Sequence, residues 1–276
     1  MDVSVVTDRY FSPDSLFWQI NRETLMVLSG PRALLLEMAH PLVAAGVAEH
    51  SDFRRRPLGR LFRTLGVMTA LNFEPHGQAK QAVDHTRHCH SAVRGTLRED
   101  VGPYLAGTPY RGTDPLLQLW VLATLVDSVL VTHDHLVRRL SLAEKQAYYR
   151  GAQRLGHAFG IPPELMPPEY DDFQTYVDAM LSSDALTVGR QGREVVQALL
   201  NAPLLGPGIR VASFISVGLT PPRLREAFGL RWTDGDERRF QWLGAAARRV
   251  RPFTPAPLVI HPQALLAEWR LRHMHG

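Results

Sequence analysis

The sequence predicts an all-α fold: a single-domain helical bundle spanning residues 1–276. Apolar residues recur at helical spacing along most of the chain, and capping residues and prolines mark several helix starts. No stretch alternates strongly between apolar and polar residues, as half-buried strands do. Neither a linker nor an internal repeat divides the chain, which is long enough to bury a sizeable core.

The first half of the chain contains five expected helices. They begin near Leu16 and cover residues 33–39, 42–49, 58–71 and 78–94. Pro41 ends the second of these helices, because the residue before a proline avoids the helical region of backbone space. Gly95 is expected to end the fifth helix, since glycine favours helix termination.

The second half begins with the longest apolar segment. Asp114 followed by Pro115 is a typical helix start, and the helix is expected to continue through Val131. Ser141 and Glu144 have the spacing of a capping box, which predicts a helix to about residue 158. Further helices are expected around residues 173–180, 224–228 and 238–249, and from residue 262 onward, whereas the loops at 187–192 and 202–209 are ambiguous.

Composition excludes several classes of protein. Hydrophobic residues make up 45% and charged residues 21% of the chain, with a net charge of +4. This balance is that of an ordinary globular protein. The single cysteine, Cys89, rules out an intrachain disulfide and a four-cysteine metal site. The N-terminal residues lack an apolar signal core, and Asp127 interrupts the run 116–131, which favours a buried core helix over a membrane span. We therefore expect a cytoplasmic protein.

Three histidines lie on the helix expected at 78–94, and helical spacing separates them. One stripe of this helix is expected to be buried, and it comprises Ala79, Val83, Thr86, His90 and Val93. His85 and His88 fall to the side of this stripe and are expected to be exposed. His90 therefore points inward, either as a core histidine bonded to a neighbour or as an iron or zinc ligand.

Other metal arrangements have less support in the sequence. A helical di-iron site needs two Glu-x-x-His pairs, and Glu37 with His40 forms only one such pair. His133 and His135 lie at an expected helix end, where we expect surface positions. A three-ligand zinc site could use His85, His88 and a distant group, but a solvated face is the better interpretation of these two histidines. His90 is therefore the candidate for a metal ligand that spacing favours, beside its interpretation as a structural histidine.

A second constellation lies on the helix expected at 58–71. Arg60 and Thr64 are four residues apart, so their side chains project from the same side of the helix. The pair is either part of a solvated charged face or a pair of hydrogen-bond donors that line a pocket.

Several segments occur in a characteristic order along nearly the whole chain. They are Pro31-Arg32-Ala33-Leu34-Leu35-Leu36, Ala39-His40-Pro41, Ala45-Gly46-Val47, His50-Ser51-Asp52-Phe53, Arg60 through Thr64, His90-Ser91-Ala92-Val93-Arg94-Gly95, Asp114-Pro115, Trp120-Val121, Ala123-Thr124-Leu125, Leu142 to Tyr149 and Gly160-Ile161-Pro162. In this order and spacing, the chain resembles the MpaB/latex-clearing (rubber) oxygenase family.

The resemblance implies an all-helical fold with a globin-like core around a b-type haem. It implies that His90 is the proximal iron ligand, that Arg94 supports that side, and that Arg60 and Thr64 belong to the distal pocket. Dioxygen is the implied co-substrate. The implied chemistry in characterised relatives is oxidative cleavage of isoprenoid carbon–carbon double bonds.

The chain departs from the family pattern at some positions. Arg63 stands where rubber-cleaving relatives carry a lysine that can ligate iron, and a guanidinium stays protonated and cannot do so. Arg63 is thus expected to contact the cofactor without ligating the iron. Leu122 replaces a histidine found in many members, and only Glu49 and Asp52 are candidates for a catalytic carboxylate. The fungal relative is membrane-anchored, and no such segment is evident here. The substrates of the relatives are therefore not assigned to this chain.

The sequence therefore predicts a haem b-dependent oxygenase that acts on a hydrophobic small molecule, isoprenoid-like or otherwise unsaturated. The electron donor, if one is used, is not specified. The alternative is a haem-free helical protein that binds a hydrophobic small molecule. A nucleic-acid-binding protein is disfavoured, because the arginines at 54–63 and 248–251 occur without a recognition motif.

Overall fold

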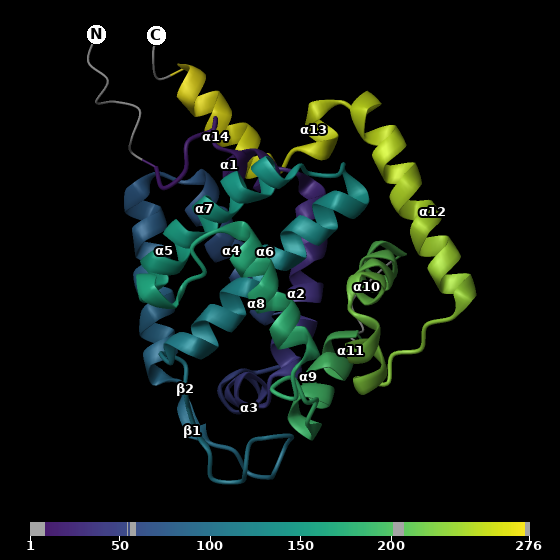
Figure 1. Cartoon of the computed structure of the whole chain (residues 1–276). Helices are drawn as coiled ribbons and strands as arrows, with labels where there is room; N and C mark the ends of the chain where they lie inside the picture. Colours follow the sequence, from purple (N-terminus) through teal and green to yellow (C-terminus); the bar gives the residue numbers. More distant parts are fainter. Residues whose placement is uncertain (1–8, 54, 56–58, 201–206, 274–276) are drawn as a thin grey trace.

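The structure, a computed structural model, describes residues 9–53, 55, 59–200 and 207–273, without the side chains of residues 60, 61 and 207–209. The described chain is all-α apart from one hairpin of two short strands, which confirms the predicted fold class (Figure 1). The main cluster of buried apolar side chains draws on residues from Phe11 to Ala267.

The elements follow one another in this order: α1 (Leu16–Asn21), η2 (Thr24–Leu28), α2 (Ser29–Ala39), α3 (Pro41–His50), α4 (Gly59–Phe73), α5 (His76–Ala92), β1 (Arg94–Thr96), β2 (Pro109–Arg111), α6 (Pro115–Leu136), α7 (Leu142–Phe159), η3 (Pro163–Leu165), α8 (Tyr170–Ser182), α9 (Arg190–Leu200), α10 (Pro207–Leu219), α11 (Pro222–Ala227), α12 (Asp234–Val250), η4 (Arg251–Phe253), α13 (Ala256–Val259) and α14 (Pro262–His273).

Local signals placed several helix boundaries correctly. The Asp114 carboxylate accepts hydrogen bonds from the first backbone amides of α6. Ser141 and Glu144 form the expected capping box at the start of α7. Pro41 occupies the first position of α3, and α2 ends at Ala39. These helix starts are therefore set by residues close in sequence, through satisfied terminal amides and restricted backbone angles.

The end of α5 differs from the prediction. The helix stops at Ala92, earlier than expected, because Arg94 begins strand β1. Strands β1 and β2 are antiparallel, with Arg94 opposite Arg111 and Gly95 opposite Tyr110. Each strand has three residues, too few for an alternating pattern to be evident in the sequence.

Helices α9 and α10 were not predicted, although each begins within a loop whose edges the sequence left ambiguous. Helix α9 starts at Arg190, inside the expected loop at 187–192, and buries one face through Val195, Val196 and Leu199. Helix α10 starts at Pro207, inside the expected loop at 202–209. Residues 201–206 lie outside the described residues.

Helix α6 is the central helix of the core, and α2 lies alongside it (Figure 1). A buried ion pair joins them: Arg32 Nη2 lies 2.8 Å from Asp127 Oδ2. Arg32 also donates to the Ser128 hydroxyl and to the Leu219 carbonyl, each at 2.8 Å. One guanidinium therefore ties α2 to α6 and α10, and its buried charge is paired and hydrogen-bonded, as buried charges must be.

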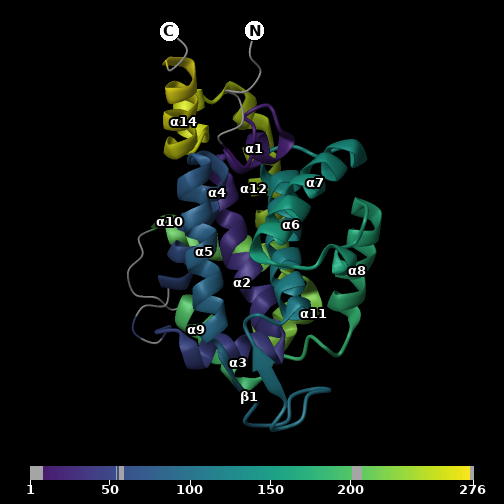
Figure 2. The same ribbon diagram turned by 90° about the vertical axis from the view of Figure 1, so that its left-hand side faces the viewer.

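By length and composition α6 could cross a membrane, but 61% of its most apolar stretch is buried within the protein. That burial agrees with the expectation of a core helix around Asp127. Figure 2 shows the molecule from the side of α4 and α5, with α2 behind them.

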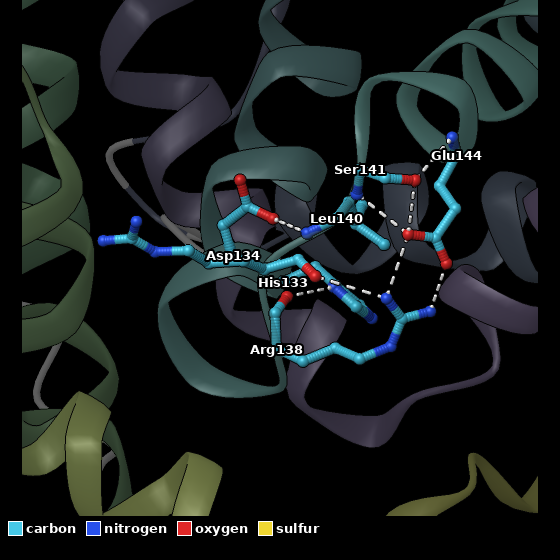
Figure 3. A network of polar contacts seen from close by, with 7 residues as sticks. His133, Asp134, Arg138, Leu140, Ser141 and Glu144 are labelled. Carbon is cyan, nitrogen blue, oxygen red and sulfur yellow. Dashed lines mark hydrogen bonds and ion pairs between the residues drawn. The ribbon is translucent and has the colours of Figure 1, made fainter.

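A polar network holds the junction between α6 and α7 (Figure 3). Asp134 accepts from the Leu140 amide at 2.8 Å, and Arg138 binds both carboxylate oxygens of Glu144 at 2.6 and 3.1 Å. His133 lies 3.0 Å from the Arg138 carbonyl and is only 4% exposed, so its predicted surface position is wrong.

His135 was also expected at the surface, and it is half-buried. Its ring stacks on Phe240 of α12, with the ring centroids 3.9 Å apart. The reason for both errors is that α6 continues to Leu136, beyond the expected end at Val131, and is covered there by neighbouring elements.

Candidate functional site

Helix α5 carries the candidate ligand His90 on the side that faces the protein. Ala79 and Val83 are buried, and Thr86, His90 and Val93 continue this stripe as half-buried residues. His85 and His88 are exposed, as helical spacing indicated. His90 is therefore less buried than a core residue, but it is more buried than His85 and His88.

The end of α5 next to His90 is held by the strand hairpin. The Val93 amide donates to the His90 carbonyl at 3.1 Å, and the Gly112 amide donates to the Val93 carbonyl at 2.8 Å. Gly112 lies so close that a Cβ atom there would be 2.6 Å from the His90 carbonyl oxygen. The backbone around His90 is thus fixed from the segment between β2 and α6.

Arg94 does not lie on the helix with His90. It is exposed on β1, and its carbonyl oxygen lies 3.1 Å from His50 Nε2. The implied role of Arg94 one helical turn beyond His90 therefore lacks its expected geometry, because α5 has already ended.

Helix α4 supplies the other predicted residues. The side chain of Arg60 lies outside the described residues, Arg63 is exposed, and Thr64 is half-buried. Thr64 lines the internal cavity of the protein. Arg63 points away from the face that carries Thr64, since consecutive helical residues project about 100° apart.

The cavity lies between α1, α2, α4, α6 and α7 and has a volume of about 120 Å³. Most of its lining is apolar, contributed by Phe17, Met26, Leu34, Leu65, Met68, Phe73, Leu125, Val126, Val129 and Leu155. His90 is not among its lining residues. The structure therefore places Thr64 at the cavity and leaves His90 outside it.

Polar side chains interrupt the apolar lining. Glu37 lines the cavity and is 4% exposed. Asn72 also lines it: its Nδ2 donates to the Met68 carbonyl at 2.7 Å, and its Oδ1 accepts no hydrogen bond from any described residue. Tyr148 donates to Asn21 at 3.4 Å, and burial raises the pKa of its phenol. Asn72 Oδ1 is thus a buried acceptor without a partner among the described residues.

The carboxylates that sequence reasoning proposed lie elsewhere. Glu49 accepts a hydrogen bond from Tyr110 at 2.7 Å and pairs with Arg98 at 2.8 Å. Desolvation alone would raise the pKa of Glu49, but the Tyr110 hydroxyl and the Arg98 charge together lower it. Asp52 is exposed. Neither residue lines the cavity, whereas two other carboxylates, Glu23 and Glu37, do. Glu23 is paired with Arg251.

Sequence reasoning weighed Glu37 only as half of a Glu-x-x-His pair. Its partner in that pair, His40, is 4% exposed, and its Nε2 lies 3.1 Å from the Tyr104 hydroxyl. Burial lowers the pKa of His40 to about 4, so the imidazole is neutral at physiological pH. Packing of α2 against α4 brings Glu37 and Thr64 to one cavity, a long-range contact without a local sequence signal.

Within the described part of the chain, no three His, Cys, Asp or Glu side chains gather as metal ligands. A metal centre built from His90 would therefore need a prosthetic group to supply most of its ligands, as haem does. Leu122 occupies the position at which the family resemblance implies a histidine in many members. It is buried on α6 and packs closely against Gly156 of α7, where an added Cβ atom would meet its side chain.

The fold and the cavity define an all-helical protein with a largely apolar cavity in its core. The chain belongs to the family described as ER-bound oxygenase mpaB/B'/Rubber oxygenase, catalytic domain, which it matches over residues 18–249. This match confirms the suspected family and identifies the chain as an oxygenase-family catalytic domain.

Two relatives from mycobacteria are similar over most of their length. An uncharacterized protein of Mycobacterium bovis and one of Mycobacterium tuberculosis are each 28% identical to this chain over 257 residues, which is 88% of this chain and 96% of each relative. No solved structure matches the chain.

Proposed function

We propose that this protein is a haem-dependent oxygenase of a hydrophobic small molecule, with His90 as the proximal iron ligand. Membership of an oxygenase catalytic-domain family over residues 18–249 is the observation that carries the proposal. The cavity beside Thr64 supports it, because its walls suit an apolar substrate.

The residue types at the site fit a haem, but the enclosed volume does not. A neutral imidazole on one helix is a common iron ligand, and His90 is half-buried on the inward side of α5. The cavity has a volume of only about 120 Å³. Pockets for larger ligands usually have volumes of roughly 300 Å³ or more. A haem held by His90 would therefore need more space than this cavity provides.

When bound, haem supplies an iron that activates dioxygen. The protein's own groups then have three tasks. Thr64, which lines the cavity, and Arg60 on the same helix would donate hydrogen bonds to negative charge that develops on oxygen, which is most effective in a dry pocket. The apolar walls exclude water and bind the substrate. Glu37 accepts or returns a proton at its carboxylate.

The substrate class that we propose is compatible with the lining. An unsaturated or isoprenoid-like chain suits the apolar residues between Leu65 and Leu155. A single hydroxyl on such a molecule would satisfy the unpaired acceptor at Asn72 Oδ1. Without a guest molecule, that oxygen carries the cost of burial without a partner.

The decisive test is the absorption spectrum of protein expressed with sufficient haem. We expect a Soret band in the wild type and its loss in His90→Ala, because the iron would have no axial protein ligand. His85→Ala and His88→Ala are matched controls on exposed positions of the same helix and should keep the band. A wild type without a Soret band, or an unchanged band in His90→Ala, contradicts the proposal.

One observation favours a second candidate function. The cavity is not lined by His90, and its volume suits a small apolar ligand. For comparison, an apolar cavity of about 150 Å³ can hold benzene. A haem-free protein that binds a small apolar molecule would have this arrangement. Colourless protein whose melting temperature rises with small apolar ligands would support this candidate over the oxygenase.

A further inference from the structure

Helix α12 lies along one edge of the molecule (Figure 1). Its two faces differ in the residues that they carry. Its inner face packs on α6 and α10 and buries Phe240 and Gly244. Its outer face carries Trp242, which is 67% exposed. A tryptophan this exposed is unusual on a surface that meets only water.

Other large apolar residues continue this outer face. Val250 is 60% exposed and Phe253 is 84% exposed. They follow Trp242 by roughly two and three helical turns. The helical path persists through η4, where the Thr254 hydroxyl donates to the Val250 carbonyl at 3.0 Å. We call Trp242, Val250 and Phe253 the α12 apolar face. Leu258 of α13, 71% exposed, follows in sequence.

The charge around the α12 apolar face is of one sign. Residues 238–267 contain five arginines and no aspartate or glutamate. Two of these arginines are used internally: Arg248 donates to the His135 carbonyl and Arg251 to Glu23.

The other three arginines are available to a partner. They are exposed and form no ion pair with a described residue: Arg238, Arg239 and Arg249. By helical spacing these three arginines flank Trp242. The exposed aromatic ring therefore has exposed arginines before and after it along the helix.

The acidic residues of α12, Asp234, Asp236 and Glu237, lie in its first turn, directly before Arg238 and Arg239. Asp236 accepts from Thr233 within the capping box, and Glu237 accepts from the Trp232 indole at 2.8 Å. Hydrogen bonds from Thr233 lower the pKa of Asp236, and the charge of Arg239 also helps to lower it. From residue 238 to residue 267 the chain carries only basic charge, so the positive charge beside Trp242, Val250 and Phe253 is not cancelled along the rest of the helix.

We propose that the α12 apolar face docks the protein on an anionic lipid membrane. Aromatic side chains favour the interface between headgroups and acyl chains, and arginines beside them attract anionic headgroups. A second copy of the chain is a poorer partner, because a symmetric contact would bring the same arginines together. This inference does not depend on haem or on oxygenase activity.

The test uses the full chain and vesicles of two compositions, phosphatidylcholine alone and phosphatidylcholine with about a third phosphatidylglycerol. We expect co-sedimentation with the anionic vesicles, weakened by salt because screening acts on exposed charges. Trp242→Ala combined with Phe253→Ala should lower the partition coefficient about tenfold, and so should Arg238→Glu combined with Arg249→Glu.

The controls are exposed residues away from this face. Leu105→Ala removes an apolar side chain that is 67% exposed, and Arg150→Glu reverses an exposed charge on α7. Both should bind vesicles like the wild type. Absence of vesicle binding, or equal losses in the controls and in the α12 variants, overturns the proposal. So does self-association without lipid that only the α12 variants abolish, since the face would then join two copies.

Discussion

Helices α5 and α6 show how differently two long helices of one protein can be held. Helix α6 has 22 residues, of which thirteen are buried, and it contacts α2, α7, α8 and α12. Helix α5 has 17 residues, of which two are buried, and it packs chiefly on α4. The helix that carries the candidate ligand is therefore the one with less core to hold it in place.

This difference predicts that the two helices differ in local stability. Segments with few buried apolar contacts open at lower free energy than the core. We therefore expect α5 to open more readily than α6 with its buried ion pair. Two comparisons of matched substitutions and one pH measurement at the end of α6 can break or sharpen this contrast.

The largest expected effect comes from breaking the ion pair of α6 and comparing the loss of stability with that from breaking an ion pair of α5. Arg32 of α2 pairs with Asp127 of α6 inside the protein, whereas Lys80 and Asp84 pair on the exposed side of α5. Arg32→Met leaves a buried carboxylate without its partner and should lower the free energy of unfolding by about 3–5 kcal/mol. Lys80→Met should change it far less, because water and salt screen an exposed pair. Urea unfolding followed by circular dichroism measures both, and similar losses for the two variants would contradict the contrast.

A smaller effect is expected from added volume. Ala123 of α6 is fully buried, whereas Ala92 at the end of α5 is exposed. Ala123→Leu overpacks the core and should cost about 1–3 kcal/mol of stability. Ala92→Leu should change stability by about 0.5 kcal/mol or less, as surface substitutions usually do. The melting temperatures of the two variants, each compared with that of the wild type, measure these losses of stability. A large loss in Ala92→Leu would mean that α5 is more enclosed than the structure shows.

The smallest effect concerns pH at the junction of α6 and α7. The Arg138 hydrogen bond, with help from Ser141, lowers the pKa of Glu144 from 4.5 to about 2. A lowered pKa in the folded state stabilises the protein above the unfolded pKa. This contribution disappears as pH falls from 4.5 through about 2.

Because the pair is partly exposed, Glu144→Gln should cost only about 0.5–1 kcal/mol at neutral pH. The difference from wild type should shrink between pH 4.5 and pH 2. Thermal unfolding across this pH range measures the stability difference between wild type and Glu144→Gln. A difference that stays constant down to pH 2 would show that ionisation of Glu144 does not contribute to stability.

Much of the fold could be predicted because its signals are local. Asp114 and Pro115, or Ser141 and Glu144, act within one helical turn, so a few residues suffice to place a helix start. Strand β1 has no such signal, since its residues are held by pairing with β2 on the far side of a long loop. His133 was misplaced because its burial depends on where α6 ends.

The candidate site likewise contains residues that a local sequence pattern identified and residues that only the packing of helices brings together. Periodicity on α5 was enough to separate His90 from His85 and His88. Glu37 and Asn72 were not found, because they meet at the cavity only through the packing of α2 against α4. The roles of His90, Arg60 and Thr64 in catalysis stay predictions that the haem spectrum and its variants will test.

The position of Gly112 has a consequence for how this chain can vary. Any other residue there would press its Cβ on the His90 carbonyl, so the last turn of α5 would unwind or tilt. The imidazole would turn with it, although Gly112 and His90 lie on different elements with a whole hairpin between them. A residue far away in the sequence, His90, therefore limits which amino acids position 112 can accept. In a mutant library of the loop before α6, we expect Gly112 to tolerate the fewest substitutions.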